Sequence, residues 1–133
     1  MKNVGSRSVY NEMKSIGENS EVINYFVGNL SLLDAEINKY EIHLVNHVLE
    51  INIYFQLSRR TKEDIRVLLT FKDVVEYNFY HNSNYIFYNV ENLKFLETER
   101  GFYFSSDPYH TDGVSENDND FVMSKGLEAF LLA

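Results

Sequence analysis

The most constraining feature of this chain is a strict alternation of apolar and polar side chains between positions 49 and 57. The apolar positions are Leu49, Ile51, Ile53, Phe55 and Leu57. The positions between them are Glu50, Asn52, Tyr54 and Gln56. A period of two places alternate side chains on opposite faces of an extended chain. The segment is therefore predicted to be a β-strand of an antiparallel sheet with one buried face.

Shorter alternating runs on both sides of this segment predict the rest of the sheet. They cover residues 37–44, 65–71, 75–79, 85–88, 93–97, 102–104 and 121–132. The phase of the first run slips between Ile37 and Tyr40, which predicts a β-bulge, and Val45–His47 is interpreted as a hairpin turn. Lys72–Asp73 is interpreted as a break between two strands. Residues 121–132 are expected to pair with an interior strand.

Residues 1–30 differ from the rest because their apolar side chains recur with helical spacing. Val9, Met13 and Ile16 predict one short helix, and the segment 20–26 predicts a second. Helices this short are marginal in water on their own, so both are expected to pack against the sheet.

These patterns predict a mainly β (α+β) protein with one domain over residues 1–133. We expect a helical lead over 1–30 and, over 34–132, a single antiparallel, strongly curled sheet or sandwich. A chain of 133 residues is long enough for one core. The sequence contains ten Phe, ten Tyr and no Trp, and aromatic residues favour the half-buried surfaces of strands.

Charge and cysteine content exclude several classes of function. The formal net charge of −8 argues against nucleic acids and anionic membranes as partners, and favours a basic protein. The chain contains no cysteine, which removes disulfides, thiolate catalysis and cysteine-based zinc sites. We identify no signal peptide in Met1–Arg7 and no apolar run long enough to span a membrane. The expected location is the cytoplasm.

No motif of the known catalytic, nucleotide-binding or metal-binding kinds is present. His43 and His47 have a metal-ligand spacing, but they flank a predicted turn rather than lie on a helix. The acidic segment 105–120 lacks the register of a calcium-binding EF-hand loop, so we interpret it as a mobile, solvated loop. The prediction is a protein without catalytic residues, cofactor or metal.

The candidate partner-binding residues lie in two regions. Residues 77–88 are predicted to form a hairpin with rings on both faces, and a Tyr-rich face left open by the core suits an interface. In the alternative interpretation, both faces are covered by other parts of the protein. The acidic loop supplies the second region. The candidates are Tyr77, Tyr80, Tyr85, Tyr88, Asp112, Glu116 and Asp118.

Two segments resemble a known family. Leu33–Ile37, with the sequence LDAEI, and Ile65–Val74, with the sequence IRVLLTFKDV, are similar to segments of the immunity proteins of bacterial polymorphic toxin systems, in particular the immunity protein 50 type. The resemblance covers about residues 30–105. It implies a cytoplasmic inhibitor that neutralises a toxin by direct binding and has no catalytic residues.

Two classes of function therefore remain open. One is a non-catalytic protein-binding module, and an acidic surface that is flat or convex would favour it. The other is a small-ligand-binding protein or enzyme that uses an aromatic pocket in the curled sheet. A deep pocket with two or more buried ionisable groups would favour this second class.

Overall fold

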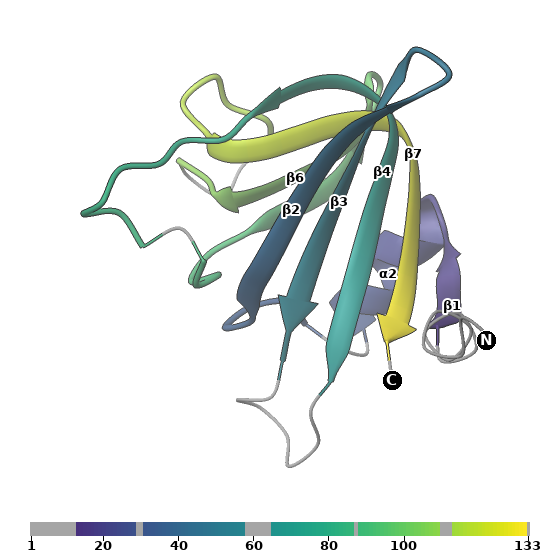
Figure 1. Ribbon diagram of the computed structural model, residues 1–133, viewed down its shortest axis with the longest axis horizontal. Helices are drawn as coiled ribbons and strands as arrows, with labels where there is room; N and C mark the ends of the chain where they lie inside the picture. Colours follow the sequence, from purple (N-terminus) through teal and green to yellow (C-terminus); the bar gives the residue numbers. More distant parts are fainter. Residues whose placement is uncertain (1–12, 29–30, 58–64, 87, 110–112, 133) are drawn as a thin grey trace, which may run out of the picture.

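The computed structural model describes residues 13–28, 31–57, 65–86, 88–109 and 113–132. These residues form seven strands and a helix (Figure 1). In chain order the elements are β1 (Met13–Glu18), α2 (Ser20–Gly28), β2 (Glu36–Val45), β3 (Val48–Gln56), β4 (Arg66–Asn78), β5 (Lys94–Thr98), β6 (Gly101–Asp107) and β7 (Asn119–Leu132).

The strands form a single antiparallel sheet in the order β2-β3-β4-β7-β6-β5. The long strand β7 pairs with β4 along one edge. Two strands pair with its other edge: β6 with residues 119–124 and β1 with residues 128–132. The prediction that 121–132 pairs with an interior strand is confirmed.

The hairpin of β2 and β3 follows the sequence pattern closely. A register shift between Ile37 and Lys39 is the predicted bulge. Asn46 and His47 both have positive φ angles, 53° and 68°, as a two-residue turn of this hand requires. The turn projects from one end of the sheet in Figure 1.

The core lies on the sheet face that α2 covers. In Figure 1 the helix passes behind β4 and β7. Val22 and Phe26 of the helix are buried, and the ring of Phe26 lies 6.2 Å from that of Phe95 in β5. Phe104 of β6 reaches Phe55 of β3, with ring centroids 5.7 Å apart. The alternating apolar residues of β3 therefore form the centre of the core, as predicted.

Two predictions about the fold are wrong in part. The sheet is open and is not strongly curled, and it does not form a sandwich. Of the N-terminal helices, the segment 20–26 is confirmed as part of α2. Residues 13–18 form strand β1 instead of the end of a helix, and Val9 lies outside the described residues.

The predicted break at Lys72–Asp73 is a bulge inside one continuous strand. Asp73 has a φ of 55°, and the register with β7 shifts between Val74 and Glu76. Residues 66–71 and 75–78 thus belong to the same strand, because β7 continues to pair with both sides of the bulge.

The predicted hairpin over 77–88 is not formed. After Asn78 the chain leaves the sheet and crosses to the start of β2, where Tyr88–Val90 runs beside it. The N–H of Ile37 donates to the carbonyl oxygen of Tyr88 at 2.7 Å, and the N–H of Val90 donates to that of Ala35 at 3.0 Å. This crossing segment, described over residues 79–86 and 88–93, forms one wall of the candidate site.

The acidic segment 105–120 is only partly a loop. Ser105–Asp107 belongs to β6, and Asn119 and Asp120 belong to β7. Asp118 and Asp120 are buried, whereas Glu116 is exposed. The prediction of a solvated loop is therefore wrong at both ends of the segment, and its mobility stays a prediction.

Candidate functional site

Two aspartates at neighbouring strand ends are joined by one tyrosine. Asp107 ends β6 and Asp120 lies at the start of β7, two strands that pair with each other. The hydroxyl of Tyr85, from the crossing segment, contacts Oδ2 of Asp107 at 2.8 Å and Oδ2 of Asp120. The backbone N–H of Tyr80 donates to Oδ1 of Asp120 at 2.8 Å. We call Asp107 and Asp120 the aspartate pair.

Burial is the largest influence on the pKa values of Asp120 and Tyr85. Burial raises the pKa of Asp120, the hydrogen bonds from Tyr85 and the Tyr80 N–H lower it, and the charge of Asp107 raises it again, with a net upward shift. Burial and the two carboxylates also raise the pKa of Tyr85, so its hydroxyl keeps its proton at neutral pH. A tyrosine hydroxyl carries a single proton and can donate it to one carboxylate at a time. The two contacts of the Tyr85 hydroxyl are therefore alternative hydrogen bonds whenever both carboxyl groups are ionised.

A cavity with mainly aromatic walls lies against Asp120. It has a volume of about 300 Å³ and is lined by Tyr40, Phe79, Tyr80, His81 and Asp120. The rings of Tyr40 and Phe79 are 4.4 Å apart, and that of Tyr80 lies 5.6 Å from that of Tyr85. We call this space the aromatic cavity.

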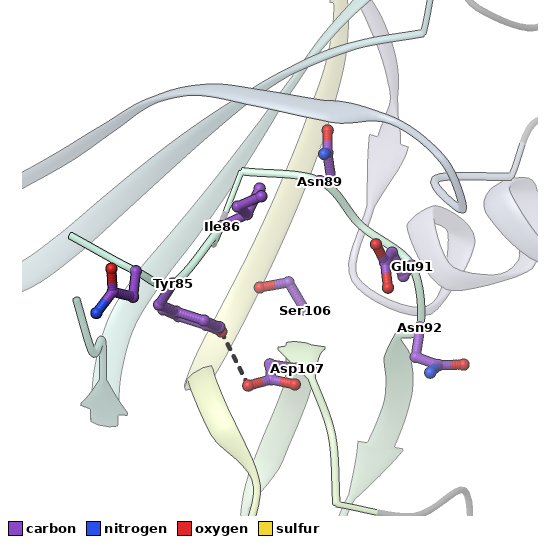
Figure 2. Close-up of a pocket in the computed structure, with 8 residues that line it drawn as sticks. Tyr85, Ile86, Asn89, Glu91, Asn92, Ser106 and Asp107 are labelled. Carbon is purple, nitrogen blue, oxygen red and sulfur yellow. Dashed lines mark hydrogen bonds between the residues drawn. The ribbon is translucent and has the colours of Figure 1, made fainter. Parts of the chain in front are cut away.

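A second cavity lies against Asp107, and we call it the polar cavity (Figure 2). Its volume is about 350 Å³. Its lining residues are Asn84, Tyr85, Ile86, Asn89, Glu91, Asn92, Ser106 and Asp107. In the view of Figure 2, Tyr85 lies on one side of Asp107, while Glu91 and Asn92 lie on the other. The crossing segment supplies most of this wall and β6 supplies the rest.

Two oxygen atoms of the polar cavity are buried without a hydrogen-bond partner among the described residues. They are Oδ1 of Asn89 and Oγ of Ser106. Ser106 is only 6% exposed. Its hydroxyl lies close enough to Tyr40 to lower that tyrosine's pKa, which burial raises overall, but the two groups do not reach hydrogen-bond geometry. Buried polar atoms without partners are uncommon in folded proteins, so this pair marks the cavity as unusual.

A third aspartate, Asp118, is in a different situation because it has a buried cation of its own. The ammonium group of Lys94 donates to both carboxylate oxygens, at 2.9 and 3.0 Å. The hydroxyl of Tyr103 and the backbone N–H groups of Tyr109 and Ser115 also donate to it, at 2.7 to 3.0 Å. Burial raises the pKa of Asp118, but these donors outweigh it and the net shift is downward. This cluster links Tyr109, Ser115 and Asp118 to Lys94 of β5 and Tyr103 of β6.

The structure brings together some of the predicted site residues and separates others. Tyr80 and Tyr85 lie together at the aspartate pair. Tyr77 and Glu116 line another cavity, of about 380 Å³. Tyr88 is exposed beside β2. Asp118 is buried in its ion pair and cannot contact a partner directly, and Asp112 lies outside the described residues.

Sequence reasoning placed Asp107 and Asp120 only among the acids of a loop, and it did not single out Tyr40, Asn89 or Ser106. A usable signal was present. Asp107 directly follows the apolar and serine run 102–106, and Asp120 directly precedes Phe121 and Val122. In the structure both acids lie at strand ends, Asp107 in β6 and Asp120 in β7.

Other polar groups give no comparable site. His43 lies at the β2–β3 hairpin, where its Nε2 is 3.5 Å from Oε2 of Glu50. Within the described residues, no three His, Asp or Glu side chains are grouped so that they could hold a metal ion. In the same part of the chain, no helix has the length and apolar character needed to cross a membrane.

Comparison with known proteins finds no matching family model, no matching curated sequence and no matching solved structure.

Proposed function

We propose that this protein is a non-catalytic binding module that recognises a basic partner protein at the aspartate pair. The observation that carries the proposal is the contrast between three aspartates. Asp118 is neutralised by Lys94, whereas no ion pair among the described residues involves Asp107 or Asp120. Asp120 is buried and Asp107 is half-buried. Carboxylates removed from water are stable when they are paired, so a cation from outside the chain would complete this site.

Exposed apolar and aromatic side chains around the aspartate pair support a protein partner. Tyr80 is 51% exposed and Ile86 is 58% exposed, and both come from the crossing segment beside the two cavities. Tyrosines form favourable contacts with cations and are frequent among residues that dominate binding energy. Tyr80 can therefore contact both a basic side chain and the apolar surface around it.

The charge of the whole chain supports the same proposal. A net charge of −8 accelerates the approach of a basic protein, and salt screens this effect. The resemblance of residues 30–105 to immunity proteins of the 50 type supports a toxin domain as the partner and the cytoplasm as the location. An inhibitor of this kind would act by stoichiometric binding.

The second candidate function is a small-ligand-binding protein or enzyme. The specific observation in its favour is Asp120, a buried carboxyl group with a raised pKa at the wall of the aromatic cavity. Such a group can act as a general acid or base. Turnover of a small molecule by the purified protein, lost in Asp120→Asn, would support this candidate over the first.

The test of the proposed function is co-expression with a basic toxin domain encoded beside this protein. Cell survival and co-purification are the readouts. Tyr80→Ala should shorten the lifetime of the complex, with about tenfold faster dissociation, since exposed rings at interface centres contribute strongly. Asp107→Asn should also speed dissociation, because it removes a charge that contacts the partner directly, and it should reduce the salt dependence of association.

Val27→Ala is the matched control, because Val27 is a highly exposed side chain on α2. It should leave both rates unchanged. Unchanged binding in both Tyr80→Ala and Asp107→Asn, with an intact complex, would place the interface elsewhere and refute the proposal.

A further inference from the structure

The polar cavity has an excess of hydrogen-bond acceptors. Both hydrogen bonds that Asp107 accepts from side chains, from Tyr85 at 2.8 Å and from Asn119 at 3.3 Å, go to its Oδ2. Its Oδ1 receives no hydrogen bond from the described residues. The buried oxygens of Asn89 and Ser106 are in the same condition. Glu91 adds an exposed carboxylate at the edge of the cavity.

This set of groups selects a particular chemistry. Two carboxylates line the cavity, and among the described residues that line it there is no Lys or Arg. The two carboxylates favour a positively charged ligand, and the acceptor oxygens favour one that presents several N–H donors at once. A guanidinium group is planar, stays charged and carries five N–H donors in a fixed arrangement. An ammonium group has three donors and holds its hydration shell more strongly.

We propose that the polar cavity is a subsite for a guanidinium group, supplied by an arginine side chain of the partner protein. The proposal rests on the proposed function for the source of the arginine, but the cavity chemistry stands by itself. Asp107 and Glu91 bind the charge. Ser106 and Asn89 accept hydrogen bonds from the guanidinium edge. A cavity of about 350 Å³ has room for this group and part of its aliphatic stem.

The direct experiment is an NMR titration of the 133-residue chain with N-acetyl-arginine amide. The expected result is a saturable shift of signals from residues 84–92 and 105–107. N-acetyl-citrulline amide is the matched ligand control, because it has almost the same shape and no charge. It should cause no saturable shift, and N-acetyl-lysine amide should bind several-fold more weakly than the arginine compound.

Two variants test the individual groups. Glu91→Gln should weaken binding of the arginine compound about tenfold, which corresponds to ~1.4 kcal/mol. Glu99→Gln is its control, since Glu99 is an exposed acid at the opposite end of the β5–β6 hairpin and should leave the affinity unchanged.

Ser106→Ala separates a binding role from a structural one. Because Oγ of Ser106 has no hydrogen-bond partner among the residues that the structure describes, its removal should leave the melting temperature unchanged or raise it. The affinity for the arginine compound should nevertheless fall. A lowered melting temperature with unchanged affinity would show that Ser106 serves the fold and would remove it from the subsite.

The outcomes distinguish this inference from the proposed function. No saturable shift with the arginine compound, or equal shifts with the citrulline compound, overturns the guanidinium subsite even if a protein partner binds. A second outcome is that the arginine compound binds at the mapped residues while the co-expression test finds no protein partner. This result supports the subsite, assigns it to a free guanidinium compound and contradicts only the proposed function.

Discussion

Removal of the Asp118 carboxylate is expected to destabilise the protein by about 4 kcal/mol. The side chain of Lys94 is 2% exposed and that of Asp118 is 0% exposed, so Asp118→Ala leaves a buried ammonium group without its counter-ion. Loss of one partner of a buried pair costs ~3–5 kcal/mol. The variant also loses the acceptor for Tyr103 and for two backbone N–H groups. Domains of this kind have a total stability of ~5–15 kcal/mol, so the variant should be marginally folded.

Urea denaturation followed by circular dichroism measures this effect. Lys94→Met and the double variant with both changes complete a double-mutant cycle. The free energy of unfolding of the double variant should be about 2 kcal/mol higher than the sum of the two single effects predicts. Glu116→Ala is the control, because that exposed acid lies in the same connection. It should change the free energy of unfolding by less than about 0.5 kcal/mol. A loss below about 1 kcal/mol in Asp118→Ala, or strictly additive effects, would refute the reasoning.

The same carboxylate gives the stability a defined pH dependence. The pKa of Asp118 is lower in the folded protein than in the unfolded chain, where it is about 3.9. Its contribution is therefore fully present above the unfolded value and is lost as the pH falls through the folded value. The wild-type protein should lose stability below about pH 4 more steeply than Asp118→Ala does. If the free energy of unfolding of the two proteins falls equally steeply at acidic pH, Asp118 is not the source of this pH dependence.

The remaining predictions concern three other positions. Ser105→Ala should lower the free energy of unfolding by ~1–3 kcal/mol in urea, because its buried hydroxyl donates at 2.6 Å to the carbonyl oxygen of Asn119 and accepts from the N–H of Asp107. Asp120→Asn should raise the melting temperature at neutral pH. The raised pKa of Asp120 means that ionisation destabilises the fold as pH rises through it, so a melting series from about pH 4 to pH 7 should become flatter in the variant. Gly101→Ala should lower the melting temperature by several degrees. Gly101 has a φ of 136°, and a Cβ there would lie 2.2 Å from the carbonyl oxygen of Ser124. An unchanged melting temperature in Gly101→Ala would show that this turn relaxes freely.

Local patterns in the sequence were sufficient for the parts of the fold that depend on neighbouring residues. The alternation at 49–57 predicted β3, and the phase slip after Ile37 predicted the bulge in β2. The turn at Asn46 and His47 and the helix α2 also follow from nearby residues. In each case the signal and the structure involve the same short segment, so no distant contact is needed to interpret it.

Tertiary pairing decided the elements whose partners are far away in the chain. Met13–Glu18 carries a helical spacing, yet it becomes a strand because it pairs with residues 128–132 of β7. Asp73 interrupts the alternation, yet β4 continues through it because β7 lies along the same edge. Distant hydrogen bonds of this kind outweigh local preferences, which are worth only a fraction of a kcal/mol per residue.

The candidate site depends almost wholly on the tertiary structure. The sequence by itself determined that the chain is acidic, rich in tyrosine and built mainly of strands. The pairing of β6 with β7, and the return of the crossing segment to β2, decided that Tyr85 meets Asp107 and Asp120. Pairing likewise decided that Lys94 neutralises Asp118 and not the aspartate pair. Charge pairing in a protein interior depends on distances of a few ångströms between residues far apart in the chain, and sequence spacing does not contain those distances.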